Sequence, residues 1–336
     1  MKRGQSGISC IVGIDKPSGM SSHDVVNACR RIFGERRVGH TGTLDPLATG
    51  ALCICVGPAT RLDAYMTNHD KTYDVRIAFG VATDTDDAEG EPIRVCEVPA
   101  CVCDPDFARE RVAALVGCHK QLPPAYSAIK HAGVKAYEAA RAGNVVQLEP
   151  RDIEIYDAAL LGLERDHTAE VLYWDVRLSV SKGTYIRSIA RDMGASLGTA
   201  AHVQQLRRLS AGVLDVRDCL SLEALESRGI DAAIDPAFLL GYRMAFLDEK
   251  QAASVRNGTF LPASSLSLFE APQRFDEADC GPMRAARPSD AALVDGETIS
   301  LVFGNELLAL YTARLKQGDL RPCCVFSQGV IRGKGL

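Results

Sequence analysis

Two segments far apart in the chain alternate apolar and polar residues with a period of two, and this pattern limits the fold more than any other feature. Residues 71–79 place Tyr, Val, Ile and Phe on one face and polar side chains on the other, and residues 172–180 repeat the alternation. Because successive side chains of a β-strand point to opposite faces, both segments indicate strands with one buried face. Residues 51–56 are continuously apolar and predict a fully buried strand.

Helical patterns lie between these strands. Ser21 or Ser22 can cap a helix whose apolar residues recur at helical spacing up to Gly34. Residues 186–197 carry a second apolar stripe, which ends at Gly198. Residues 36–49 have no periodicity and are rich in Gly and Thr, which predicts a loop. The first two thirds of the chain therefore mix helices and strands.

The residue pattern of the sequence changes after residue 242. Residues 255–258 are typical of a turn, and residues 270–288 are polar and contain proline. Residues 298–303 and 307–315 predict two short strands around a Gly304-Asn305 turn. These features indicate a small β-rich module that a helical stretch joins to the main part.

Composition excludes several classes of protein. No run of 18 or more apolar residues exists, which excludes a membrane-spanning helix, and residues 8–14 are too short for a signal peptide. We therefore expect a cytoplasmic protein. The 12 cysteines include no C-x-x-C pair, and none of the 7 histidines clusters with them. Zinc sites usually need such paired ligands, so we expect reduced cysteines and no metal.

The charges are segregated along the sequence, although the net charge is only −5. Residues 81–110 hold nine acids and two bases, whereas residues 175–212 hold six bases and two acids, and residues 118–151 five bases and two acids. Such segregation permits a basic groove for phosphates even in a chain with an acidic balance.

Residues 39–50, with the sequence GHTGTLDPLATG, are the most informative segment. They form the end of the predicted loop, where three glycines allow close approach of the backbone to a ligand. The segment presents one imidazole, His40, and one carboxylate, Asp45. An Asp-Pro pair alone commonly starts a turn, so the functional information lies in the complete sequence of the segment.

The sequence of residues 39–50 resembles the catalytic loop of the TruB family of pseudouridine synthases. The resemblance continues in order through residues 15–22, with the family's Lys-Pro motif, and 71–86, with its tyrosine strand. It extends through residues 123–141, similar to the thumb loop that grips RNA, and through 181–187 and 202–209, similar to the last active-site blocks. Ordered blocks over this length make a chance match negligible.

The resemblance implies a fold and a division into domains. It implies a mixed α+β pseudouridine synthase fold on a largely antiparallel sheet over residues 1–242, with a thumb-like RNA-binding loop at about 120–151. Residues 243–336 resemble the family's PUA-type RNA-binding module only loosely, and the segment at 270–290 has the character of an insertion. Asp45, Tyr73, Tyr185 and Arg187 are expected to converge on one cleft.

The family's activity is the conversion of uridine 55 in the T-arm of tRNA to pseudouridine, without a cofactor and by flipping the base out of the RNA. The resemblance makes Asp45 the catalytic carboxylate, Tyr185 the acceptor of the C5 proton and Arg187 the partner of Asp45. The residues matched to substrate binding are His40, Tyr73, Leu206, Lys16, Lys182, Arg207 and Arg208. His40 would fill the vacated space, Tyr73 and Leu206 would contact the uracil, and Arg207 and Arg208 would meet phosphates. Lys16 would be partly structural.

Other functions remain open at this point. A guide-RNA-dependent relative would act only inside a protein complex, and the basic stretch at 120–151 favours the stand-alone enzyme. A non-enzymatic RNA-folding factor would not need Asp45, Tyr185 and Arg187 together. An unrelated glycosidase would need two carboxylates beside the bond, and the loop offers one. We expect a monomer that binds tRNA, with no obligatory protein partner and no membrane association.

Overall fold

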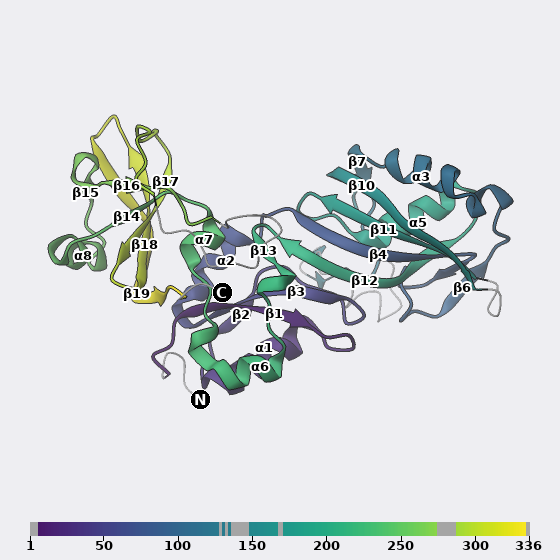
Figure 1. Ribbon diagram of the computed structural model, residues 1–336, viewed down its shortest axis with the longest axis horizontal. Coiled ribbons are helices and arrows are strands. Elements are labelled where there is room, and N and C mark those ends of the chain that lie inside the picture. Colours follow the sequence, from purple (N-terminus) through teal and green to yellow (C-terminus); the bar gives the residue numbers. More distant parts are fainter. Residues whose placement is uncertain are drawn as a thin grey trace. The chain divides into compact units, whose positions relative to one another are not determined.

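The computed structural model describes residues 6–127, 130–131, 134–135, 148–166, 171–273 and 287–333. The chain divides into two compact units. Unit 1 consists of residues 1–46, 50–68 and 211–336, and unit 2 of residues 47–49 and 69–210. Each unit therefore combines segments that are distant in sequence (Figure 1).

Unit 2 is built on an antiparallel sheet. Its strands lie in the order β12 (Ala201–Ala211), β4 (Lys71–Phe79), β11 (Val171–Val180), β10 (Arg151–Asp166) and β7 (Gly117–Gln121). The pairs β4–β11, β11–β10 and β10–β7 are antiparallel. Helix α3 (Pro105–Ala113) lies against β10 and α5 (Ile186–Ser196) against β4 (Figure 1). Among the described residues of unit 2, the remaining elements are β5 (Val81–Thr83), β6 (Pro92–Val95), η2 (Ala100–Cys103), β8 (Lys130–His131) and β9 (Val134–Lys135).

The two predicted amphipathic strands of unit 2 are confirmed as β4 and β11, which pair with each other. Tyr73, Val75, Ile77 and Phe79 of β4 are all buried, as the alternation requires. The Phe79 ring packs 4.7 Å from Trp174 of β11, measured between ring centroids. The Trp174 indole N–H donates to the Val102 carbonyl at 3.0 Å, so this fully buried ring keeps its polar atom satisfied.

The N-terminal segment of unit 1 contains β1 (Cys10–Lys16), α1 (Ser22–Phe33), β2 (Val38–His40) and β3 (Thr49–Val56). Strand β3 pairs antiparallel with both β1 and β2. The predicted helix is confirmed: Ser21 forms a capping box with Asp24, and Gly34 ends the helix with φ +60°. The predicted loop at 36–49 is wrong at its start, because residues 38–40 form β2 on the edge of β3.

The rest of unit 1 holds short helices and a second sheet, with strands in the order β15-β19-β18-β17-β14-β16. The strands of this sheet are β14 (Met244–Phe246), β15 (Leu261–Pro262), β16 (Leu268–Phe269), β17 (Thr298–Phe303), β18 (Glu306–Arg314) and β19 (Asp319–Ile331). The short strand β13 (Leu214–Asp215) is not part of it. The helices are η1 (Gly57–Leu62), α2 (Asp63–Met66), η3 (Val216–Asp218), α6 (Leu222–Arg228), η4 (Gly229–Ala232), α7 (Pro236–Leu240), α8 (Glu249–Arg256) and η5 (Ala263–Ser265). The predicted hairpin is confirmed as β17–β18. The predicted turn at 255–258 is confirmed at Asn257 and Gly258, whereas its first two residues belong to α8, which continues to Arg256.

One apolar core in unit 1 joins the C-terminal sheet to the N-terminal strands. Phe326 and Leu307 of this sheet share a buried cluster with Ile11, Cys55 and Leu62. Residues on both sides of the predicted domain boundary at 242/243 therefore form one core. The division into a catalytic domain and a C-terminal domain stays a prediction. No helix among the described residues has the length and apolar character needed to cross a membrane.

Candidate active site

The loop that carries Asp45 connects β2 to β3, and the residue before Asp45 is fixed to the start of α1. The Ser22 hydroxyl accepts a hydrogen bond from the Leu44 backbone N–H at 2.8 Å and donates to the Leu44 carbonyl at 3.0 Å. Ser22 and Leu44 are both buried, whereas the Asp45 side chain is partly exposed. One hydroxyl thus satisfies both backbone groups next to the predicted catalytic carboxylate.

The residue after Asp45 is fixed by Lys16 from β1. Lys16 is fully buried, and its ammonium donates to the carbonyls of Pro17 at 2.9 Å, Met20 at 2.6 Å and Pro46 at 3.1 Å. The Gly19 backbone N–H also donates to the Pro46 carbonyl, at 2.9 Å. Three carbonyls around one ammonium compensate for its loss of hydration. Residues 16–22 therefore form a cradle that fixes the Asp45 loop on both sides.

His40 is the last residue of β2 and lies opposite Ile54 of β3. The next residue, Thr41, donates its N–H to the Cys53 carbonyl at 3.1 Å. The imidazole is therefore presented from a strand end, while Asp45 follows on the loop. Both belong to unit 1.

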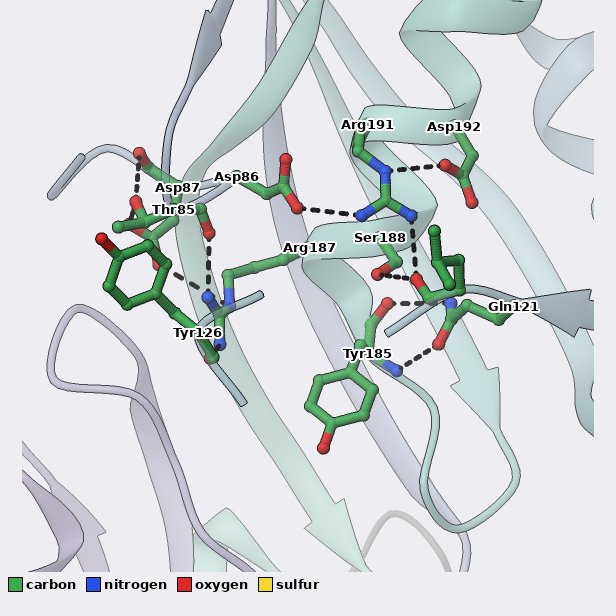
Figure 2. Close-up of polar contacts among 11 residues, drawn as sticks. Thr85, Asp86, Asp87, Gln121, Tyr126, Tyr185, Arg187, Ser188, Arg191 and Asp192 are labelled. Atoms are coloured by element: carbon green, nitrogen blue, oxygen red, sulfur yellow. Dashed lines mark hydrogen bonds and ion pairs between the residues drawn. The ribbon is translucent and has the colours of Figure 1, made fainter. Parts of the chain in front are cut away.

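Tyr185 and Arg187 lie at the start of α5 in unit 2. Arg187 is 5% exposed, and its guanidinium donates to the Thr85 carbonyl at 2.8 Å and the Tyr126 carbonyl at 2.9 Å (Figure 2). Its Nε atom is 3.7 Å from a carboxylate oxygen of Asp87. Asp87 was not singled out from the sequence. The predicted pairing of Arg187 with Asp45 joins residues of different units and stays a prediction.

Asp87 is a buried carboxylate held by its own turn. It accepts hydrogen bonds from the Thr85 hydroxyl at 2.6 Å and the Glu89 backbone N–H at 3.1 Å. The adjacent Asp86 adopts φ +62° and reaches Arg191 at 3.1 Å. Burial raises the pKa of Asp86, and the charge of Arg191 opposes that rise. Residues 85–87 therefore supply two carboxylates to two arginines of α5 (Figure 2).

The other predicted site residues of unit 2 lie on strands or in a turn. Tyr73 on β4 is 6% exposed and lies opposite Leu178 of β11. Leu206 on β12 is buried, and the neighbouring Arg207 donates to the Thr49 hydroxyl at 3.4 Å. Lys182 is exposed in the turn between β11 and α5.

Arg208 does not fit the role expected of it. This side chain is fully buried, so its guanidinium has no surface to offer a phosphate. Lys71 lies close to it: burial and the positive charge of Arg208 lower the pKa of Lys71 to about 8. Arg208 is therefore a buried cation of unit 2, and we expect Arg207 alone of this pair to contact RNA.

Many acidic and basic residues that lie in separate segments of the sequence form ion pairs in the fold. Besides the contacts of Asp86 and Asp87, Arg177 pairs with Asp74 at 2.7 Å and Arg76 with Asp175 at 2.8 Å. Lys120, one of the bases of the 118–151 stretch, pairs with Asp152. The excess of bases counted along residues 175–212 thus overstates the positive charge available to RNA.

Unit 1 contains a basic cavity that the sequence did not reveal. It has a volume of about 430 Å³, and its lining includes Arg30, Arg36, Arg37, Thr60 and Asp63. Arg37 donates to the Thr60 hydroxyl at 2.7 Å. Within the described part of the chain, none of the three arginines forms an ion pair with a carboxylate. The cavity therefore offers guanidinium groups to an anion.

About half of the predicted thumb at 120–151 lies outside the described residues, namely residues 128–129, 132–133 and 136–147. The family-matched positions Gly133, Tyr137 and Arg141 are among them. Residues 274–286, most of the predicted insertion, lie outside as well. Among the described residues, no group of three or more His, Cys, Asp or Glu side chains is arranged to hold a metal ion.

Two solved structures define the class of fold. A chain of an H/ACA RNP bound to a substrate RNA containing 2'-deoxyuridine aligns with a TM-score of 0.62 and 19% identity, covering 98% of this chain and 86% of that one. A chain of a Cbf5-Nop10-Gar1 complex aligns with a TM-score of 0.61 and 22% identity, covering 92% and 79%. The predicted mixed α/β pseudouridine synthase fold with a C-terminal β-rich module is confirmed.

Sequence comparison then identifies the family. Residues 30–186 match the model "TruB family pseudouridylate synthase (N terminal domain)", and residues 187–237 match "tRNA pseudouridylate synthase B C-terminal domain". The tRNA pseudouridine synthase B of Geobacillus thermodenitrificans is 38% identical over 93% of this chain and 98% of its own length. That of a Mycobacterium strain is 41% identical over 76% of this chain and 85% of its own length. The chain belongs to the TruB family of pseudouridine synthases.

Proposed function

We propose that this enzyme converts uridine 55 in the T-arm of tRNA to pseudouridine, acting alone and without a cofactor. The similarity to tRNA pseudouridine synthase B along nearly the whole length of both chains supports tRNA as the substrate. The observation that carries the proposal is the cradle around Asp45, in which Ser22 fixes Leu44 and Lys16 fixes Pro46. A loop fixed on both sides of one carboxylate is what a positioned catalytic group requires.

The reaction is an isomerisation, so no oxidant or reductant is needed. The C1′–N1 bond breaks, the uracil turns within the pocket, and C5 forms a new bond to C1′. The C5 proton leaves and N1 gains a proton. Asp45 either adds to C1′ or removes the C2′ proton to give a glycal-like intermediate, and a carboxylate can serve either route.

Tyr185 takes the C5 proton after the new bond has formed, and Arg187 keeps Asp45 ionised and oriented. The guanidinium of Arg187 is buried and is held by the backbone carbonyls of Thr85 and Tyr126 and by the Asp87 carboxylate. Such a guanidinium is fixed before the substrate arrives, which favours a site that works by preorganised charge.

RNA recognition rests on base flipping and on phosphate contacts. His40 fills the space that the uridine vacates, while Tyr73 and Leu206 contact the uracil. Lys182 and Arg207 contact phosphates, and the basic cavity at Arg36 and Arg37 offers a further phosphate contact. Residues 1–242 act as the catalytic domain, and residues 243–336 act as a PUA-like RNA-binding module.

The test is to incubate the purified chain with an unmodified tRNA transcript and to map pseudouridine by position. We expect a single modified position, uridine 55, and no modification of a transcript in which cytidine replaces this uridine. A chain that modifies RNA only after a guide RNA and partner proteins are added would contradict the proposal. A chain that accelerates tRNA folding without forming pseudouridine would identify an RNA-folding factor instead.

A further inference from the structure

Tyr185 occupies the N-cap of α5, a position where a tyrosine cannot do what N-cap residues usually do. Ser, Thr, Asn and Asp are favoured there because their short side chains bond to the backbone of the first turn. Tyr185 has extended backbone angles, φ −100° and ψ 111°, and no such side-chain bond. The Tyr185 side chain therefore does not cap this helix.

Gln121, the last residue of β7, provides that contact. The Tyr185 backbone N–H donates to the Gln121 side-chain oxygen at 2.8 Å, and the Gln121 side-chain NH₂ donates to the Tyr185 carbonyl at 3.0 Å. Gln121 is 4% exposed, and its own backbone is fixed by the pairing of β7 with β10, where it lies opposite Arg151. The amide thus pairs with the backbone of Tyr185 much as a neighbouring strand would.

The contacts with Gln121 involve the backbone of Tyr185 and not its side chain. Figure 2 shows the Tyr185 ring directed away from Gln121, whose amide faces the backbone of the same residue. The first helical bond of α5, from the Ile189 N–H, goes to the same Tyr185 carbonyl at 3.2 Å. Both backbone groups of Tyr185 are therefore bonded while its hydroxyl points elsewhere.

We propose that Gln121 is a positioning residue for Tyr185, which fixes the tyrosine so that its hydroxyl meets the C5 proton of the rotated uracil. The proposal rests on the proposed role of Tyr185. A glutamine is suited to the task because one planar group both accepts and donates, which neither a carboxylate nor an apolar side chain can do.

The first test is Gln121→Met, which keeps the approximate size of the side chain and removes both hydrogen bonds. The turnover rate at saturating tRNA should fall by about 10- to 100-fold, the scale of a misplacement near 1 Å, and KM should stay within about threefold. The transcript carries deuterium at C5 of the target uridine. Removal of the C5 proton should become slower than the other steps, so the isotope effect on turnover should exceed that of the parent enzyme.

Ser188→Ala is the matched control. Ser188 is the third residue of α5, and its hydroxyl donates to the Leu122 carbonyl at 2.9 Å, so this bond reaches the residue next to Gln121 and not Tyr185. Its turnover and isotope effect should stay within about twofold of those of the parent enzyme, because the Leu122 carbonyl keeps Arg191 as a donor at 2.9 Å. An equal loss in both variants would show a general contribution of the segment to folding and would overturn the proposal.

Gln121→Glu provides a second readout, because its carboxyl group can lose and regain the donor with pH. An ionised carboxylate accepts from the Tyr185 N–H but repels its carbonyl, whereas a protonated carboxyl group restores the donor. The activity of this variant relative to that of the parent should therefore rise as the pH is lowered. A ratio independent of pH, or a folded Gln121→Met with parental turnover and isotope effect, would refute the role of Gln121. The role of Tyr185 is tested separately, because Tyr185→Phe should be inactive whether or not Gln121 positions it.

Discussion

Replacing Lys16 with methionine tests the cradle of the Asp45 loop. The substitution preserves the length of the side chain and removes the ammonium that donates to the carbonyls of Pro17, Met20 and Pro46. The Pro46 carbonyl keeps the Gly19 N–H as a second donor, whereas no other donor to Pro17 or Met20 is found among the described residues. The variant therefore loses the only donor identified for two carbonyls and weakens the position of the third.

The size of the effect follows from these contacts. A buried group that loses its partner costs about 1–3 kcal/mol. Pro17 lies at the surface, so water replaces part of its bond, and the apolar methionine avoids the cost of a buried charge. We expect a loss of about 2–3 kcal/mol in the free energy of unfolding. Because the Pro46 carbonyl adjoins Asp45, the single-turnover rate should also fall, by about tenfold.

The assay combines urea denaturation with single-turnover pseudouridine formation at saturating tRNA. Lys250→Met is the control, because Lys250 is an exposed lysine of α8, far in sequence from the catalytic loop. That variant should match the parent enzyme in both measurements. A Lys16→Met protein that loses stability but keeps the parental rate would show that the cradle does not hold Asp45, and unchanged stability would refute the account of the carbonyl contacts.

Three further predictions concern the core, a buried cation and the RNA contacts. Deleting residues 243–336 removes Phe326 and Leu307 from the apolar core that they share with Ile11. Each large buried side chain contributes about 1.5–3 kcal/mol, so the loss of the core residues in this segment should unfold unit 1. A truncated protein with a parental melting temperature would contradict this. The pKa of Lys71 is lowered from 10.5 in the unfolded chain to about 8 in the fold. Between these pH values the unfolded chain binds more protons than the folded protein, so the contribution of Lys71 makes the free energy of unfolding increase as the pH rises. The stability of Lys71→Met relative to the parent should thus decrease from pH 7.5 to 10, and a constant difference would refute the shift. Affinity for tRNA should fall with salt with a slope of about −2 to −3 in log K against log salt, less steep than the sequence charges suggest because several bases pair with carboxylates. A slope near zero would mean that phosphates are not contacted.

Local patterns predicted the elements that local forces determine. The alternation at 71–79 gave β4 with its buried face, and Ser21 and Gly34 marked the two ends of α1 within one residue. Strand β19 was not predicted, because its register shifts and its Pro322 interrupt any regular alternation. Strand β2 has only three residues and depends on its pairing with β3, so it leaves no periodic signal of its own.

The candidate site was predictable only where a motif carried it. The resemblance to the family singled out Asp45, Tyr185 and Arg187, but nothing in the sequence paired Gln121 with Tyr185, 64 residues later. Contacts of this kind depend on the tertiary fold and not on periodicity. The same holds for the charges: segregation of acids and bases along the chain suggested a basic groove, whereas Asp86 and Arg191, 105 residues apart, meet as an ion pair.

The most direct test of the central claim is the Asp45→Asn variant. The substitution keeps the size and polarity of the side chain, and the contacts of Ser22 and Lys16 involve the backbone on either side, so the loop should survive. The charge that either chemical route requires is lost. Release of tritium from C5-labelled uridine in tRNA should therefore fall by at least about four orders of magnitude. Binding of the same transcript, measured on filters, should change by less than about tenfold, or 1.4 kcal/mol. An Asn variant that turns over at a few per cent of the parental rate would show that Asp45 is not the catalytic residue.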